Sequence, residues 1–182
     1  GRQDFEQAES WFRKALEAGH TGFRYWIGHL LLHRGQVSEA FAQLEKAPAS
    51  KDLGAAYLMV RYCDDVAACP ISHASIKGMK QALASATTMQ KNNLAWVLAT
   101  DPLCDTKDGR YATDLMMSMK NTDRNRWAYL DTLAAANARS GDFDGAIMAE
   151  RRAIGMLPKT MKPSSKNALI ARLAGYRSHH VF

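Results

Sequence analysis

The stretch 129–153, YLDTLAAANARSGDFDGAIMAERRA, constrains the fold more than any other part of the chain. From Leu130 to Asn137 the residues that face one side recur at i, i+3, i+4 and i+7, which is the spacing of a helix. A short turn at Gly141 interrupts this pattern, and helical spacing then resumes until Pro158. Two amphipathic helices joined in this way cannot bury both apolar faces alone, so the hairpin must stack against neighbouring elements.

Helical spacing also covers most of the remaining chain. Gly19 and Gly35 are placed to stop helices, and Ser72 is placed as the N-cap of another. A turn-rich loop at 101–109 is expected to separate two of the helices. The fold class predicted from this pattern is all-α, with the other helices at 4–19, 23–33, 37–47, 53–67, 72–85, 88–100, 111–119 and 167–177.

The hairpin at 129–158 resembles a tetratricopeptide repeat, whose pattern combines spaced large residues, an Ala-x3-Phe pair and a closing Pro. Ala112 and Ala146 are 34 residues apart, which is one period of that family. The segment 4–47 resembles the Sel1-like branch of the same repeats, with a period of 32. Glu150 departs from the pattern because the family has an aromatic residue there. The resemblance implies a right-handed α-solenoid of antiparallel helix hairpins, closed by a C-terminal capping helix.

The length of 182 residues fits a single domain, which we expect to span 1–182. The opening inside a repeat, with Gly1 in place of Met, predicts that the chain is a fragment of a larger protein. The expected units are a half repeat at 1–20, repeats at 21–49, 50–87 (degenerate), 88–122 and 126–158, and a cap at 164–178.

In the family, the first helix of each hairpin lines a concave groove that binds an extended peptide or a partner helix. Side chains on those helices that lie off the packing stripe are therefore candidates for partner binding. Asn and Arg side chains can hold a peptide by hydrogen bonds, and aromatic side chains supply rigid contact area. The alternative for each residue is packing between repeats or solvent exposure. The candidates are Tyr25, His29, His33, Asn92, Trp96, Asp131 and Arg139.

The net charge of +6 is concentrated at the C-terminal end. Residues 151–182 hold seven of the 24 Lys and Arg and none of the 18 Asp and Glu. This basic patch is either a solvated capping helix or a surface for an anionic partner such as nucleic acid. Its members are Arg151, Arg152, Lys159, Lys162, Lys166, Arg172 and Arg177.

No catalytic motif is present, and we expect neither an enzyme nor a cofactor. His29 and His33 stand at i, i+4, a spacing that can share a metal, but no third ligand follows and no metal site is predicted. The odd cysteine count leaves at least one free thiol. Cys63 and Cys69 are either bridged or both free, and that choice is the best internal indication of compartment.

The resemblance implies a protein-interaction module that binds a peptide or partner protein and scaffolds a bacterial assembly. The first alternative is binding to nucleic acid or another anionic surface through 151–177, and the second is self-association into a homo-oligomer. No apolar run approaches the ~18 residues that a bilayer crossing needs, so membrane insertion is not expected. The expected location is the bacterial cytoplasm or periplasm.

Overall fold

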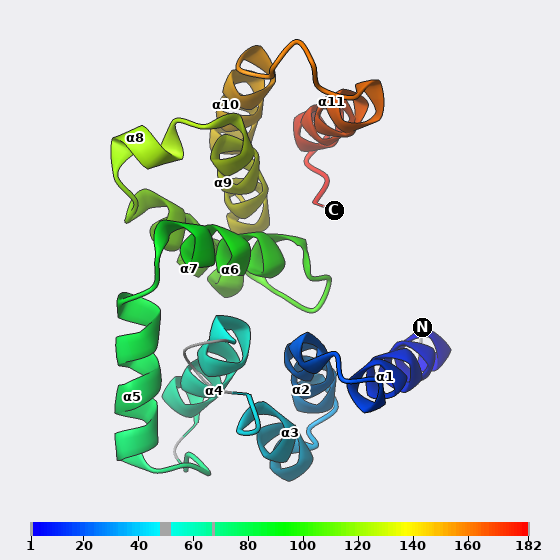
Figure 1. Ribbon diagram of the computed structural model, residues 1–182, viewed down its shortest axis with the longest axis vertical. Coiled ribbons are helices and arrows are strands. Elements are labelled where there is room, and N and C mark those ends of the chain that lie inside the picture. The colour runs from blue at the N-terminus through cyan, green and yellow to red at the C-terminus, as the bar shows by residue number, and fades with distance from the viewer. Residues whose placement is uncertain (1, 48–51, 67, 182) are drawn as a thin grey trace. The chain divides into compact units, whose positions relative to one another are not determined.

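The computed structural model describes residues 2–47, 52–66 and 68–181, where all the regular elements are helices (Figure 1). The all-α prediction is confirmed for these residues. The chain divides into two compact units, Gly1–Ala86 and Thr87–Phe182, called unit 1 and unit 2 below. None of the described helices combines the length and the apolar character that crossing a membrane requires.

Unit 1 is a series of helices in which each one packs against the next, and α2 also contacts α4. Ile27, Leu31 and Ala40 form a buried core, onto which Phe12 packs. The Ser72 hydroxyl accepts a hydrogen bond from the Ser75 N–H, so the predicted N-cap is confirmed. The elements of unit 1 are α1 (Arg2–Glu17), the 3₁₀ helix η1 (Thr21–Phe23), α2 (Arg24–His33), α3 (Val37–Leu44), α4 (Leu53–Asp65) and α5 (His73–Ala84).

A disulfide bond joins Cys63, near the end of α4, to Cys69 in the connection to α5. The third cysteine, Cys104, is a buried thiol of unit 2 that takes no part in the disulfide. Of the two arrangements left open by the sequence, the structure therefore has the bridged one, and it leaves one thiol unbridged.

Unit 2 contains two helix hairpins, α6–α7 and α9–α10, followed by a last helix that lies along α10 (Figure 1). Helix α9 contacts α6, α7 and α10, so it is the central element of the unit. The elements of unit 2 are α6 (Thr88–Thr100), α7 (Thr106–Met117), the short α8 (Asn121–Arg124), α9 (Trp127–Ser140), α10 (Phe143–Gly155) and α11 (Pro163–Arg177).

Two glycines determine how these hairpins turn and how closely they approach. Gly141 ends α9 in the left-handed conformation with a φ of 93°, which a residue without Cβ adopts at little cost. A Cβ atom at Gly109 would lie 2.4 Å from the backbone nitrogen of Ser140. Only glycine therefore allows α7 to lie this close to the end of α9.

Unit 2 differs from the prediction at the starts of α7 and α11 and in the presence of the short α8. The Asp105 carboxylate accepts hydrogen bonds from the N–H groups of the first turn, so α7 begins at Thr106 and the predicted loop to Gly109 is wrong. Helix α11 begins at Pro163 instead of 167, because proline at the first helical position loses no intrahelical hydrogen bond. Helix α8 was not predicted, since its four residues are too few for a periodic pattern.

Candidate functional site

The predicted groove residues of unit 1 take part in packing within α2 and against α4. Tyr25 is buried, and its ring packs against Gly54, where an added Cβ would lie 2.7 Å from the ring. The Tyr25 hydroxyl and Nδ1 of His29 lie 3.4 Å apart, and His29 is also buried. His33 is the exposed member of this set. Two of the three residues that were predicted to bind a partner, Tyr25 and His29, therefore have a structural role.

Two predicted groove residues of unit 2 differ in how well their polar atoms are satisfied. Arg139 donates from Nε to the Ala99 carbonyl at 3.0 Å and from Nη1 to the Cys104 carbonyl at 3.2 Å. These bonds tie α9 to the last turn of α6, at Ala99, and to the connection between α6 and α7, at Cys104. Asn92 on α6 is different, because its Oδ1 is buried and accepts no hydrogen bond from the described residues. A buried acceptor without a donor is costly, so Asn92 is the less satisfied of the two.

The other two groove residues of unit 2 converge on the last helix. Arg172 of α11 donates from Nε and Nη2 to the two carboxylate oxygens of Asp131 on α9, each at 2.9 Å. The guanidinium carbon of Arg172 also lies 5.5 Å from the ring centroid of Trp96 on α6, within the range of a cation–π contact. Side chains from three helices therefore meet around one guanidinium.

This arrangement corrects the prediction that Arg172 faces water. Only 18% of its side chain is exposed, and its charge is matched by the Asp131 carboxylate. Bidentate pairs of this kind fix the orientation of both partners. Arg172 therefore fastens α11 to α9 instead of joining the basic surface.

Glu150 of α10 lies behind this ion pair and is fully buried. Its carboxyl oxygens accept no hydrogen bond from the described residues, and the Arg172 Nε lies 3.7 Å away. Burial, and then the nearby Asp131 charge, raise the pKa of Glu150 to about 9. Glu150 is therefore protonated at neutral pH, which leaves one negative and one positive charge in the cluster. We call Asp131, Glu150 and Arg172 the buried charge cluster.

The cluster suits an internal ion pair better than a metal site or a catalytic acid–base pair. Arg172 already occupies both oxygens of Asp131, and a guanidinium cannot give up its proton to free them. Burial raises the pKa of Asp131, while the Arg172 charge opposes that shift. The chemistry left open to a ligand on this face is hydrogen bonding at Asn92 and contact with the half-buried Trp96.

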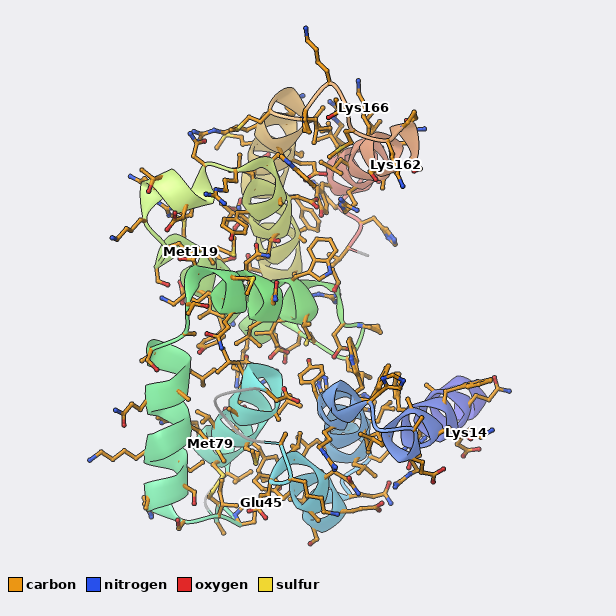
Figure 2. The ribbon with its side chains drawn as sticks, viewed as in Figure 1. Lys14, Glu45, Met79, Met119, Lys162 and Lys166 are labelled. Carbon is orange, nitrogen blue, oxygen red and sulfur yellow. A yellow bond between two sulfur atoms is a disulfide. The ribbon has the colours of Figure 1, made fainter. Side chains whose placement is uncertain are left out.

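The other six residues of the predicted basic patch are exposed. Lys162 and Lys166, labelled in Figure 2, belong to the start of α11. Arg152 of α10 donates from Nη2 to the Asn125 side-chain oxygen at 2.7 Å. The exposed members are Arg151, Arg152, Lys159, Lys162, Lys166 and Arg177.

The sequence contained a signal for one of the site residues that were not predicted, and none for others. Glu150 falls between Ala146 and Ala153 on the apolar stripe of α10, and a charge on such a stripe indicates a buried ionisable group. Asn125, the partner of Arg152, had no comparable signal, because it follows a helix of only four residues.

Comparison with known proteins gives no match, whether against protein-family models, curated proteins or solved structures. The resemblance to tetratricopeptide and Sel1-like repeats therefore rests on the sequence pattern. Function has to be argued from the packing and the chemistry of the described residues.

Proposed function

We propose that the chain is a non-catalytic protein-interaction module of tetratricopeptide or Sel1-like type, which binds a peptide or partner protein along its first helices. The helix order of unit 2 supports this proposal. Two hairpins follow one another, their first helices α6 and α9 are in contact, and α11 follows as a cap. A right-handed stack of such hairpins would extend the same pattern, as in helical-repeat proteins.

The observation that carries the proposal is the buried Asn92 Oδ1, which accepts no hydrogen bond from the described residues and belongs to the same helical face as Trp96. These residues stand four positions apart on α6, so their side chains are neighbours on the helix surface. The Asn92 side chain is half-buried, so a rotation of its amide group would bring the buried oxygen to a peptide N–H, which would supply the hydrogen bond that it lacks. The Trp96 ring, held by Arg172, would provide a rigid apolar contact beside it. We call Asn92, Trp96 and Arg172 the α6–α11 face.

Affinity capture from a lysate of the source organism tests this function when it is done with three proteins in parallel. These are the unaltered chain, Asn92→Ala and the matched control Asn93→Ala, whose side chain is exposed on the next position of α6. We expect a protein partner that survives high salt, is lost with Asn92→Ala and is kept with Asn93→Ala. Equal capture by both variants would place binding elsewhere.

The same experiment distinguishes binding of a protein partner from the alternative, which is anion binding through 151–177. Binding of nucleic acid weakens steeply with salt, because each neutralised phosphate releases counterions. Recovery of nucleic acid alone, washed off at high salt, would make the exposed lysines and arginines the working surface. We expect this outcome less, because Arg172 is already paired with Asp131.

We propose that the protein resides in an oxidising compartment, such as the periplasm expected for a bacterial protein. The support is the Cys63–Cys69 disulfide, since bonds of this kind persist where thiols are not kept reduced. Titration of denatured protein with a thiol reagent should find one thiol, Cys104, before reduction and three after it. Three thiols before reduction, in protein isolated from its natural compartment, would contradict this location.

A further inference from the structure

A pocket of about 450 Å³ lies in unit 2, away from the α6–α11 face. It is formed by the end of α7, the short α8, the first two turns of α9 and the later part of α10. Pockets of this size commonly enclose small molecules, which are held by an apolar lining and a few polar groups. Its lining contains both apolar and polar side chains.

Two arginines in the lining have no carboxylate partner among the described residues. Arg124 donates to the side-chain oxygen of Asn121, and its Nη1 also donates to the Met117 carbonyl at 3.2 Å. Arg152 donates to the side-chain oxygen of Asn125 at 2.7 Å. All these acceptors are neutral, and neither guanidinium has a carboxylate partner among the described residues.

Two other arginines of the chain are paired with carboxylates instead. Arg172 is paired with Asp131, and Arg13 in unit 1 is paired with Glu9 and Glu39. The asparagines of the pocket orient their guanidiniums by hydrogen bonds without neutralising them. Guanidiniums fixed in this way suit the planar, bidentate recognition of a carboxylate or phosphate.

The rest of the lining is apolar. Leu130 is buried and Leu133 is partly buried, and both come from the first turns of α9. The Met117 side chain at the rim is 55% exposed, which is high for a large apolar side chain. The Met117 sulfur accepts a hydrogen bond from Arg124 Nη1 at 2.9 Å, so this adaptable side chain lies beside the guanidinium at the rim.

We propose that this pocket binds a small organic anion, whose carboxylate or phosphate lies between Arg124 and Arg152 and whose apolar part lies on Leu130 and Leu133. The site goes beyond the proposed partner binding, because it uses other helices and a different class of ligand. The anionic group is selected by the two charged guanidiniums, and the apolar part by the leucine floor.

Calorimetric titration of the full chain with four six-carbon probes tests the proposal. Hexanoate and hexyl phosphate carry the anion, hexanol is neutral, and hexylamine carries the opposite charge. We expect the two anions to bind and the alcohol and amine to bind at least about tenfold more weakly, as hydrogen bonds to charged groups imply. Hexanol binding as tightly as hexanoate, or no binding of either anion at millimolar concentration, would overturn the proposal.

A matched pair of variants locates the binding. Arg124→Gln with Arg152→Gln removes the two guanidiniums of the pocket, while Arg151→Gln with Arg177→Gln removes the same net charge from exposed positions outside the lining. The first pair should weaken hexanoate binding by about tenfold or more, and the second should leave it within about twofold. Equal losses in both pairs would mean that only net charge attracts the anion. Circular dichroism of each variant shows whether the fold is kept.

Discussion

Glu150 and Arg152 stand two residues apart on α10, and their surroundings are opposite. Glu150 is fully buried beside Asp131 and Arg172, whereas Arg152 is exposed and held by the neutral side chain of Asn125. Residues at i and i+2 of a helix point to different sides. One side of α10 therefore faces the buried charge cluster that fastens α11, and the other faces a pocket whose arginines have no carboxylate partner among the described residues.

The difference shows how arginine can serve structure in one place and recognition in another. Arg172 is paired with Asp131 in the cluster, whereas Arg152 donates to the neutral Asn125 in the pocket. In the cluster, burial makes an unmatched charge costly, so the cluster holds one carboxylate, one guanidinium and one protonated carboxyl group. In the pocket, exposure to water keeps an unmatched guanidinium tolerable. Substitutions in the cluster should accordingly lower the stability of unit 2. Substitutions in the pocket should weaken ligand binding and change stability less.

Replacement of Arg172 should have the largest effect on stability. Arg172→Met keeps the length of the side chain but leaves the Asp131 carboxylate buried without its partner. Breaking a buried pair in this way costs about 3 kcal/mol or more. Urea denaturation at neutral pH, followed by the amide exchange of α11, should show this loss in the free energy of unfolding of unit 2.

Arg177→Met is the control for that loss, because Arg177 is exposed on the same helix. It should change the free energy of unfolding by no more than about 0.5 kcal/mol. If the two variants were equally stable, the ion pair would contribute nothing and the account of the cluster would be wrong.

The pH dependence of stability should come next in size. The pKa of Glu150 is about 9 in the folded state and near 4.5 when unfolded, so between these values only the folded state holds the proton. The stability that this proton confers is fully present below pH 4.5 and is lost as pH rises through 9. The free energy of unfolding of unit 2 should fall with rising pH, by at most about 1.4 kcal/mol per pH unit.

Glu150→Gln tests the origin of that slope, since the amide has nearly the same shape and cannot ionise. Denaturation midpoints measured at several pH values should vary less in this variant than in the unaltered chain. An unchanged slope would show that another group is responsible, with Asp131 the first candidate because burial raises its pKa too.

The smallest effect on stability should come from the pocket. Arg124→Gln with Arg152→Gln removes two guanidiniums that have no carboxylate partners among the described residues. The melting temperature should therefore stay close to that of the unaltered chain, with a change in free energy of no more than about 0.5 kcal/mol. A loss comparable to that of Arg172→Met would assign the pocket arginines a structural role.

The sequence predicted the helices well because the signals that define them are local. Helical spacing, the Ser72 cap and the Gly141 turn are each readable within a few residues, and the structure has all three. The predicted ends were less accurate where a single residue decides the start, as Asp105 does for α7 and Pro163 for α11.

Such local signals could not predict which side chains far apart in the sequence come into contact. Asp131 and Arg172 are 41 residues apart, and Arg152 and Asn125 are 27 apart, so each contact depends on how one helix folds back on another. Glu150 was visible as a charge on an apolar stripe, but its partners come from two other helices. The groove prediction named Trp96 and Asp131 without indicating that α11 would contact both.

The most direct test of the account measures how tightly one captured partner binds when either the α6–α11 face or the pocket is altered. Its affinity should be measured by calorimetry for the unaltered chain, Asn92→Ala, Asn93→Ala, and Arg124→Gln with Arg152→Gln. We predict a loss of about fivefold or more for Asn92→Ala, as one hydrogen bond and its unsatisfied partner imply, and little change for the others. Unchanged affinity of Asn92→Ala together with loss in the arginine variant would contradict the account, because the partner would then bind at the pocket.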